Sequence, residues 1–427
     1  MLAGLAFLAS AATLTVGDDD DYRTITDAVA ASAPGDQIVI APGVYAEVLE
    51  LPHVLSLEGT GASARDTVLL NPRGSMLMRS ASSLSLTNLT LDGGGRGGLL
   101  EVVAPAASVV LTDLELHSAG PYADTPTAVV LDVSDAVQLD HVRVSDLFID
   151  GFFVDTRTTT VHGSTFERID GVALTTHDTV TLTDCTFASN SGRGLVLREL
   201  VRSSIRIEGS HFEGNAGALF IDLNGFYGGE IAVIGNQFLD NHAEVAGGAI
   251  DLSEPSFFGD VRIIGNVFAG NSAGSLGGAV RINDPYYFSD YYDYVGYDRT
   301  SIEVTLARNT FVENAAPSGA HLRCRDDIAL HMANNLFVGA QEGSGISSER
   351  PPRRSGYNLY FANALGDLER GVPSATAVFA DPLFVDWSAD GNPLNDDFRL
   401  APDSPAIDAG LPAFLDPDGS RSDLGAL

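Results

Sequence analysis

The chain has 427 residues, of which 57 are acidic and 24 basic, and all of the basic residues are arginine, so the formal net charge is −33. Because phosphate contacts need clustered basic side chains, this composition argues against a nucleic-acid-binding protein. The absence of lysine excludes Schiff-base and lysine-base chemistry, and two cysteines are too few for a disulfide framework or a cysteine-ligated zinc site.

The first 15 residues read as a signal peptide. An apolar run, Leu2 to Leu8, precedes the small residues Ala9-Ser10-Ala11, which fit a small-x-small cleavage site. The run is too short for a transmembrane helix, which needs roughly 20 residues. We therefore expect a bacterial exported protein, secreted or held at the cell surface, with no transmembrane segment. A buried first strand is the alternative interpretation.

Residues 22–33 predict a short helix ahead of the first strand. Ile25, Ala28 and Val29 recur with a helical period, and Pro34-Gly35 marks the end of the segment. The strand that follows, residues 36–41, alternates apolar side chains. We expect this capping helix to plug the first end of the fold described next.

Residues 16–340 form one repeat region, and in its later repeats a Phe is followed three residues later by an Asn. The Phe residues recur at intervals of 21 to 30 residues, with one interval of 43, and only short alternating strands lie between them. This pattern predicts an all-β fold, a right-handed parallel β-helix solenoid of roughly a dozen coils. The Phe side chains should stack inside it, and the Asn side chains should form amide ladders. The clearest instances are Phe187/Asn190, Phe212/Asn215, Phe238/Asn241, Phe268/Asn271 and Phe311/Asn314.

The 43-residue interval contains an insertion, residues 284–298, that is rich in tyrosine. Insertions in a solenoid become loops on its side, often on the binding face. Tyrosine offers an apolar ring and a hydroxyl, which suit sugar rings or a protein partner. A loop that packs its own rings against the solenoid is the alternative. The candidate ligand-binding residues are Tyr286, Tyr287, Tyr291, Tyr292, Tyr294 and Tyr297.

Charged residues in the later repeats form a candidate site. Alignment of the strands on their glycines places Leu197, Phe220, Asp251 and Arg281 in one outward row, and Glu199, Asp222, Ser253 and Asn283 in the next. Neighbouring carboxylates repel unless a cation bridges them or one is protonated. Glu199, Asp222 and Asp251 are therefore candidate calcium ligands. A solvated acidic face with one surface ion pair is the alternative.

Residues 341–427 lose the repeat and predict an irregular C-terminal cap. Within them, residues 416–423 carry oxygen side chains at alternate positions, as calcium loops do. A tail that hydrogen-bonds to itself is the other interpretation of this loop.

Three segments resemble known families. Residues 21–45, with Pro34-Gly-Asp-Gln-Ile-Val-Ile-Ala-Pro-Gly43, resemble the first coil of pectinesterases and of the wider pectin-lyase-like superfamily. The Phe-x-x-Asn and Gly-Gly-Ala-Ile units resemble the repeats of polymorphic outer membrane proteins, which are surface adhesins. The tail, with Asp381-Pro-Leu-Phe384 and Asp423-Leu-Gly-Ala426, is similar to the choice-of-anchor Q domain of bacterial β-helix proteins. The pectinesterase active-site strand has no counterpart.

The resemblances imply a cell-surface or secreted β-helix protein that binds a polysaccharide or a surface protein, as an adhesin does, without an assigned catalytic activity. The alternative comes from β-helix polysaccharide lyases, in which calcium held by carboxylates lies beside an arginine base. It would be a calcium-assisted pectate or uronate lyase acting by β-elimination. Its base would be Arg281 or Arg198, and Glu199, Asp222 and Asp251 would hold the calcium.

Overall fold

The computed structural model describes residues 11–121, 126–198, 200, 203–223, 227–253, 258–282, 302–325 and 328–426. The chain divides into two compact units, Met1–Thr156 and Arg157–Leu427. In each unit, successive turns of the chain contribute strands to three parallel sheets, which we name A, B and C, with one strand per sheet in all but the terminal turns. The fold class is confirmed as an all-β parallel solenoid of about 12 turns.

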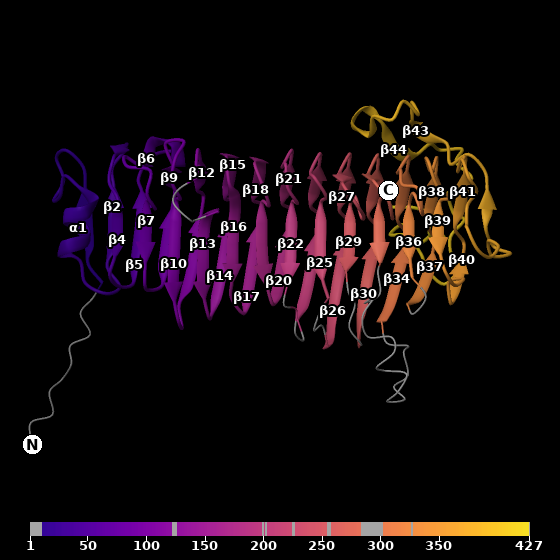
Figure 1. The fold of residues 1–427 in the computed structure, drawn as a ribbon, viewed down its shortest axis with the longest axis horizontal. Coiled ribbons are helices and arrows are strands. Elements are labelled where there is room, and N and C mark those ends of the chain that lie inside the picture. The colour runs from indigo at the N-terminus through magenta and orange to yellow at the C-terminus, as the bar shows by residue number, and fades with distance from the viewer. Residues whose placement is uncertain are drawn as a thin grey trace, which may run out of the picture. The chain divides into compact units, whose positions relative to one another are not determined.

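The first unit contains strands of all three sheets in a repeating order (Figure 1). Sheet A consists of β1 (Thr13–Val16), β2 (Gln37–Ile40), β5 (Leu55–Gly59), β8 (Leu84–Thr87), β11 (Ser108–Thr112) and β14 (Ala136–Asp140). Sheet B consists of β3 (Gly43–Tyr45), β6 (Thr67–Leu70), β9 (Thr90–Asp92), β12 (Glu115–His117) and β15 (Arg143–Leu147). Sheet C consists of β4 (Leu49–Leu51), β7 (Met78–Ser80), β10 (Leu100–Ala104), β13 (Thr127–Val133) and β16 (Asp150–Asp155).

The second unit repeats this order over more turns. Its sheet A consists of β17 (Thr158–His162), β20 (Thr179–Thr183), β23 (Ser204–Glu208), β26 (Tyr227–Ile234), β30 (Phe258–Ile264), β34 (Ile302–Ala307), β37 (Ala329–Ala333) and β40 (Arg354–Gly356). Its sheet B consists of β18 (Thr165–Ile169), β21 (Thr186–Ala188), β24 (His211–Glu213), β27 (Gln237–Leu239), β31 (Val267–Ala269), β35 (Thr310–Val312), β38 (Leu336–Val338), β41 (Leu359–Phe361) and β42 (Val378–Phe379). Its sheet C consists of β19 (Leu174–His177), β22 (Leu195–Arg198), β25 (Leu219–Asp222), β29 (Ile250–Ser253), β33 (Val280–Ile282), β36 (Leu322–Cys324) and β39 (Ile346–Ser348).

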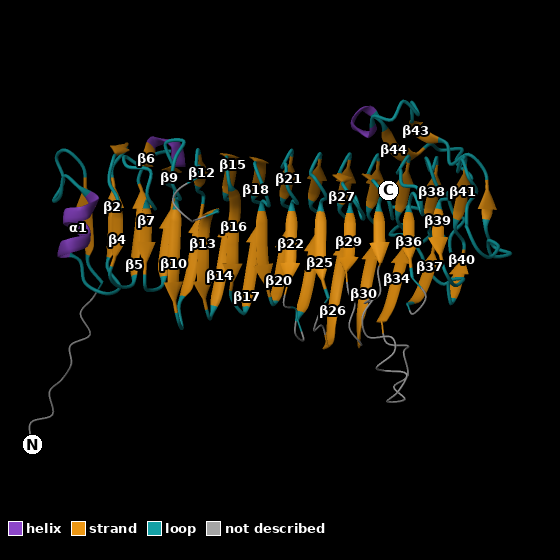
Figure 2. Ribbon diagram, viewed as in Figure 1, coloured by secondary structure: helices purple, strands orange, loops and turns teal. Residues whose placement is uncertain are grey.

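Little else is regular in the described residues, as Figure 2 shows. There is one α-helix, α1 (Ile25–Ala31), with two 3₁₀ turns, η1 (Ala64–Asp66) and η2 (Pro393–Asn395). The second unit adds a short parallel pair, β28 (His242–Ala243) with β32 (Ser272–Ala273), and an antiparallel pair, β43 (Phe384–Asp386) with β44 (Asp397–Leu400).

The predicted N-terminal helix is present with narrower bounds than residues 22–33. The side chain of Thr24 caps it by accepting a hydrogen bond from the Asp27 N–H, at 3.1 Å. The Glu47 carboxylate accepts from the N–H groups of Ile25 and Thr26, at 3.0 and 2.9 Å. The apolar side of α1 packs against β1, β2 and β4. Because β1 begins at Thr13, the last residues of the segment expected to be a signal peptide belong to sheet A.

A stack of aromatic rings runs through the interior of the second unit, as the Phe spacing predicts. Adjacent rings are nearly parallel, and their centroids lie 4.7 to 5.0 Å apart. This separation equals the spacing of hydrogen-bonded strands, so each coil adds one ring. The stack comprises Phe166, Phe187, Phe212, Phe238, Phe268, Phe311 and Phe337, and continues to Tyr360 and Phe379.

Two ladders of buried asparagines accompany the aromatic stack. In each ladder, the Oδ1 of one Asn accepts from the backbone N–H and the Nδ2 of the Asn in the preceding coil, as between Asn215 and Asn241 at 3.1 and 2.9 Å. The Nδ2 also donates to a backbone carbonyl of a neighbouring coil. The ladders therefore satisfy the polar groups of the buried turns. Their members are Asn190, Asn215, Asn241, Asn271 and Asn314 in one, and Asn236, Asn266, Asn309, Asn335 and Asn358 in the other.

The first ladder has a gap that a histidine fills. The coil of Phe337 carries Ala340 where the five preceding coils carry Asn, and the imidazole of His321 lies there instead, fully buried. Its Nδ1 lies 3.1 Å from Asn314 Nδ2, and its Nε2 lies 3.2 Å from Asn363 Oδ1. A neutral ring protonated on Nε2 satisfies both contacts. Burial lowers the pKa of His321 to about 3.

Cys185 occupies a position equivalent to the second Asn ladder, two coils before Asn236. Its thiol donates to the carbonyl of Thr183, at 3.2 Å, and burial raises its pKa to about 12. Cys185 and Cys324 are both buried, and neither forms a disulfide.

The C-terminal region differs from the predicted division at residue 340. The three sheets continue beyond it through β39, β40, β41 and β42. The segment that follows packs on the outer face of sheet B, beside β38 and β41 (Figure 1). This face needs a cover because its outward residues there are apolar: Phe384, Phe398 and Leu424 bury Val267, Val312 and Val338.

Asn241→Ala should destabilise the second unit by about 2–4 kcal/mol, because it removes one step of the ladder and leaves buried groups of Asn215 without a partner. Urea unfolding followed by circular dichroism measures this loss. Asn395→Ala, in an exposed turn, is the control and should change stability by less than about 0.5 kcal/mol. A similar effect of both substitutions would contradict the ladder's role.

Because of His321, the free energy of unfolding should decrease as the pH is lowered from 6.5 to about 3. In that window the unfolded chain binds a proton on this histidine and the folded chain does not. Lowering the pH therefore shifts the equilibrium toward the unfolded chain. His321→Gln should flatten this part of the stability profile measured by urea unfolding. The control His141→Gln, at an exposed residue, should leave the slope unchanged; an unchanged slope in His321→Gln would refute the assignment.

Candidate functional site

The outward face of sheet C in the second unit carries a row of side chains, one from each strand. Ile250 and Leu252 point into the core with 0% exposure, so Asp251 between them points outward. Strand pairing places Asp251 beside Arg281 on the next coil. The row is Thr175, Val196, Phe220, Asp251, Arg281, Arg323 and Ser347.

Asp251 and Arg281 are neighbours in one row, as predicted, and they form an ion pair with 2.7 Å from Oδ1 to Nε. The predicted neighbour of Phe220, Leu197, is wrong by one residue: Val196 pairs with Phe220, and Leu197 is buried. Alignment on glycines failed here because the buried pair of Leu195 and Leu219 sets the register, and a slip of one residue would turn the core side chains outward.

A second arginine, Arg193, completes the cluster and was not predicted. It lies in the turn before β22, its guanidinium is 3.9 Å from the centre of the Phe220 ring, and its Nη2 is 3.5 Å from Asp251 Oδ2. The sequence does contain a signal, since Arg193 stands where the following coils have glycine, at Gly217 and Gly248 by strand register. We name Arg193, Asp251 and Arg281 the arginine fork.

Asp251 is more buried than the arginine that it pairs with most closely. Its side chain is 5% exposed and that of Arg281 is 15% exposed. Burial raises the pKa of the Asp251 carboxyl, while Arg281 and then Arg193 oppose that rise. Burial also lowers the pKa of Arg193, whereas the charge of Asp251 raises it. The cluster carries two positive charges and one negative charge when all three groups are ionised.

The fork keeps donors for a ligand. Asp251 uses only Nε of Arg281, and within the described ranges the two terminal NH₂ groups of Arg281 have no protein partner. Guanidinium groups whose terminal NH₂ groups lack partners bind carboxylates through paired, charge-assisted hydrogen bonds. The arrangement can therefore bind an anionic group from solvent.

The row continues to Arg323, which is already paired. Its Nη2 lies 2.8 Å from Glu349 Oε1, and its Nη1 lies 3.2 Å from the hydroxyl of Ser347. Ser347 in turn donates to the carboxylate of Glu369. These bonds leave Arg323 less able than Arg281 to receive an anion.

The predicted calcium ligands and bases are distributed differently from the expectation. Asp251 is not presented as a calcium ligand, because each of its oxygens faces an arginine. Asp222 lies in the neighbouring row, opposite Ser253, as predicted. Arg198 is exposed and pairs by register with His177, three strands from Arg281. Glu199 and the tyrosines Tyr286, Tyr287, Tyr291, Tyr292, Tyr294 and Tyr297 lie outside the described residues.

The C-terminal loop proposed as a calcium loop bonds to its own chain. Asp418 Oδ1 accepts from the N–H and hydroxyl of Ser420, at 2.9 and 2.6 Å. Asp416 pairs with Arg308, at 3.2 Å, and accepts from the Asp423 N–H. This is the self-bonded alternative, and these carboxylates are already hydrogen-bonded without a metal.

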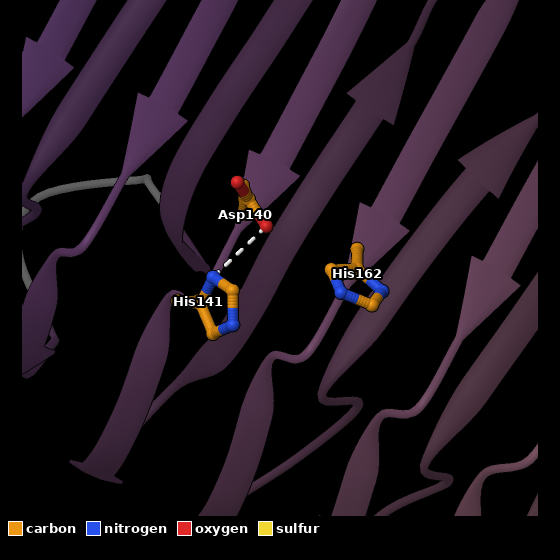
Figure 3. A group of neighbouring side chains, drawn as sticks. All are labelled: Asp140, His141 and His162. Atoms are coloured by element: carbon orange, nitrogen blue, oxygen red, sulfur yellow. Dashed lines mark ion pairs between the residues drawn. The ribbon is translucent and has the colours of Figure 1, made fainter.

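Exposed histidines do not add a catalytic group to the fork. At the end of the first unit, Asp140 Oδ1 lies 3.0 Å from His141 Nδ1 (Figure 3), and both side chains reach solvent. His162, also drawn there, belongs to the second unit, where its Nδ1 lies 2.9 Å from the Thr183 hydroxyl. Exposed pairs of this kind contribute at most about 1 kcal/mol.

None of the helices among the described residues is long and apolar enough to cross a membrane.

Three comparisons relate the chain to known proteins, and the family model supports the fold. A family model described as the right handed beta helix region matches residues 127–351, and a search of curated proteins finds no match. Pectate lyase Pel9A is 13% identical, with a TM-score of 0.40, covering 98% of this chain and 96% of that one. The Azotobacter vinelandii mannuronan C-5 epimerase AlgE6 A-module is 13% identical, with a TM-score of 0.40 and coverage of 84% and 93%. Pectin methylesterase PemA from Erwinia chrysanthemi is 15% identical, with a TM-score of 0.32 and coverage of 52% and 81%.

Asp251→Ala should destabilise the second unit by about 1–3 kcal/mol, since it leaves two half-buried guanidinium groups without their shared carboxylate. Urea unfolding measures the change. Asp260→Ala, at an exposed carboxylate 3.8 Å from Arg262, is the matched control and should cost less than about 1 kcal/mol. If the two substitutions cost the same, Asp251 does not anchor the fork.

Proposed function

The chain belongs to the right-handed β-helix family, and from that premise we propose that it binds an acidic polysaccharide on sheet C of its second unit. In this proposal the protein is exported, and it acts at the cell surface or outside the cell as an adhesin-like binding protein. A uronate carboxylate binds at the arginine fork. The single observation that carries the proposal is the Asp251-anchored pair of arginines with ligand-facing donors left on Arg281.

The net charge of −33 limits how such a ligand is recognised. Long-range attraction of a polyanion is excluded, so the affinity must come from short-range bonds at the fork. The Debye length is about 8 Å at physiological salt, which screens the distant acidic surface but not a direct guanidinium–carboxylate contact. The protein should therefore recognise single carboxylates along the polysaccharide and not its overall density of negative charge.

Two features favour binding over the lyase alternative. A lyase of the expected kind needs Asp251 on calcium, whereas this carboxylate is engaged by Arg193 and Arg281. It also needs a neutral arginine base, whereas arginine side chains are effectively always protonated in proteins. The tyrosine-rich insertion, residues 284–298, would add a platform for sugar rings in this proposal, and its deletion should weaken binding without unfolding the chain.

The test is affinity electrophoresis with polygalacturonate, with fully methyl-esterified pectin as the uncharged matched ligand. We expect the protein to be retarded by polygalacturonate and not by the ester. Arg281→Gln should weaken the retardation about tenfold, the effect of losing roughly 1.4 kcal/mol of charge-assisted hydrogen bonding. Equal retardation by both polymers would contradict the proposal.

Arg79→Gln is the matched control variant. Arg79 also lies on sheet C, in the first unit, and its Nε lies 2.6 Å from Glu101, but Glu50 lies nearby as well, at 3.5 Å. This arginine should not bind an anion, and its replacement should leave retardation unchanged. Calcium-dependent formation of unsaturated uronate during the same incubations would favour the lyase alternative, and its loss in Arg281→Gln would assign that activity to the fork.

A further inference from the structure

A hollow of about 620 Å³ lies on the sheet A side of the second unit, away from the arginine fork on sheet C. Strands β34, β37 and β40 form its floor, and the C-terminal segment forms one wall. Glu303, Thr305, His331 and Arg354 line it with polar groups, and Leu411 and Phe414 line it with apolar ones. Its volume lies in the range of small-molecule sites.

The charged residues of the hollow are spread across its floor. Strand pairing places Thr305, His331 and Arg354 side by side on successive strands, and Glu303 lies two residues before Thr305. With strands about 4.8 Å apart and 3.3 Å per residue, the Cα atoms of Glu303 and Arg354 are roughly 12 Å apart. A negative group and a positive group thus lie at opposite ends, with an imidazole between them.

These three side chains have no protein partner. Among the residues that the structure describes, Glu303, His331 and Arg354 make no hydrogen bond or ion pair through their side chains. Arg262, which precedes Thr305 in the same row, is by contrast paired with Glu230 at 2.9 Å. The hollow therefore contains ionisable groups of both signs that the fold itself does not use.

The apolar wall is held in place by the C-terminal segment's own contacts. The Leu411 N–H donates to Asn334 Oδ1, at 2.8 Å, and Arg308 pairs with Asp416 just beyond Phe414, at 3.2 Å. Phe414 nevertheless remains 53% exposed. A large aromatic ring held at the edge of a hollow is a preformed contact surface for an apolar group.

We propose that this hollow binds a zwitterion of dipeptide size that carries an apolar side chain. The ammonium group pairs with Glu303, the carboxylate pairs with Arg354 with a further N–H from His331, and the side chain packs on Phe414 and Leu411. The separation of the two charges suits a ligand with ammonium and carboxylate at opposite ends. A ligand without net charge also avoids the repulsion that the −33 chain exerts on anions.

Isothermal titration of the full chain with the dipeptide L-leucyl-L-phenylalanine tests the proposal. N-acetylated and C-amidated forms of the same dipeptide remove one charge each and should bind about tenfold more weakly. Glu303→Gln should weaken the free dipeptide about tenfold but leave the affinity of the acetylated form unchanged. Arg354→Gln should also weaken the free dipeptide about tenfold but leave the affinity of the amidated form unchanged. This crossed pattern assigns each charge to its residue.

Asp260→Asn and Arg353→Gln are the matched controls. Asp260 directly precedes Glu303 in its row, and Arg353 is the exposed neighbour of Arg354, but neither lines the hollow. Both should bind the dipeptide like the unaltered chain, and circular dichroism checks that all variants fold. No heat of binding, equal affinity for capped and free dipeptides, or binding of galacturonate in place of the dipeptide would overturn the proposal.

Discussion

The hydrogen bond from one buried asparagine to the next is the interaction on which the second unit depends. Each side-chain amide joins its own coil to a neighbouring coil, and the separation of the Phe rings, 4.7 to 5.0 Å, matches the spacing that these bonds impose. A buried amide without a partner would cost more than the bond contributes, so a gap in the ladder must be filled. His321 shows this directly, since it takes the position that Ala340 leaves empty.

This constraint also explains why a functional group can be built on the surface of the solenoid. When coils stack at a fixed distance, side chains at equivalent positions form straight outward rows, so residues 30 apart in sequence meet as a pair. Asp251 and Arg281 are such a pair. Arg193 then reaches the pair from a turn, over the ring of Phe220. The rigid interior holds the fork in one geometry without a ligand, which reduces the entropy cost of binding.

The sequence contained enough information to predict the solenoid, because Phe and Asn recur at a coil-length period and each has one physical role. The contact of Asp251 with Arg281 was predictable for the same reason. Arg193 was missed because it lies in a turn, at a position where the following coils have glycine, and the sequence does not show where a long side chain there will reach. His321 was missed because it lies outside the ladder's sequence frame. The fold-back of Phe384 and Leu424 depends on apolar residues facing outward on sheet B, which no local pattern reveals.

The central claim is that a uronate carboxylate binds the terminal NH₂ groups of Arg281. Nitrogen-15 NMR of arginine side chains, recorded during titration with trigalacturonate, tests it most directly. The account predicts that the Nη resonances of Arg281 shift and slow their rotation at saturation, with smaller shifts for Arg193, while Arg79 and Arg262 remain unchanged. Saturation without any change at Arg281, or equal changes at all four arginines, would contradict the account.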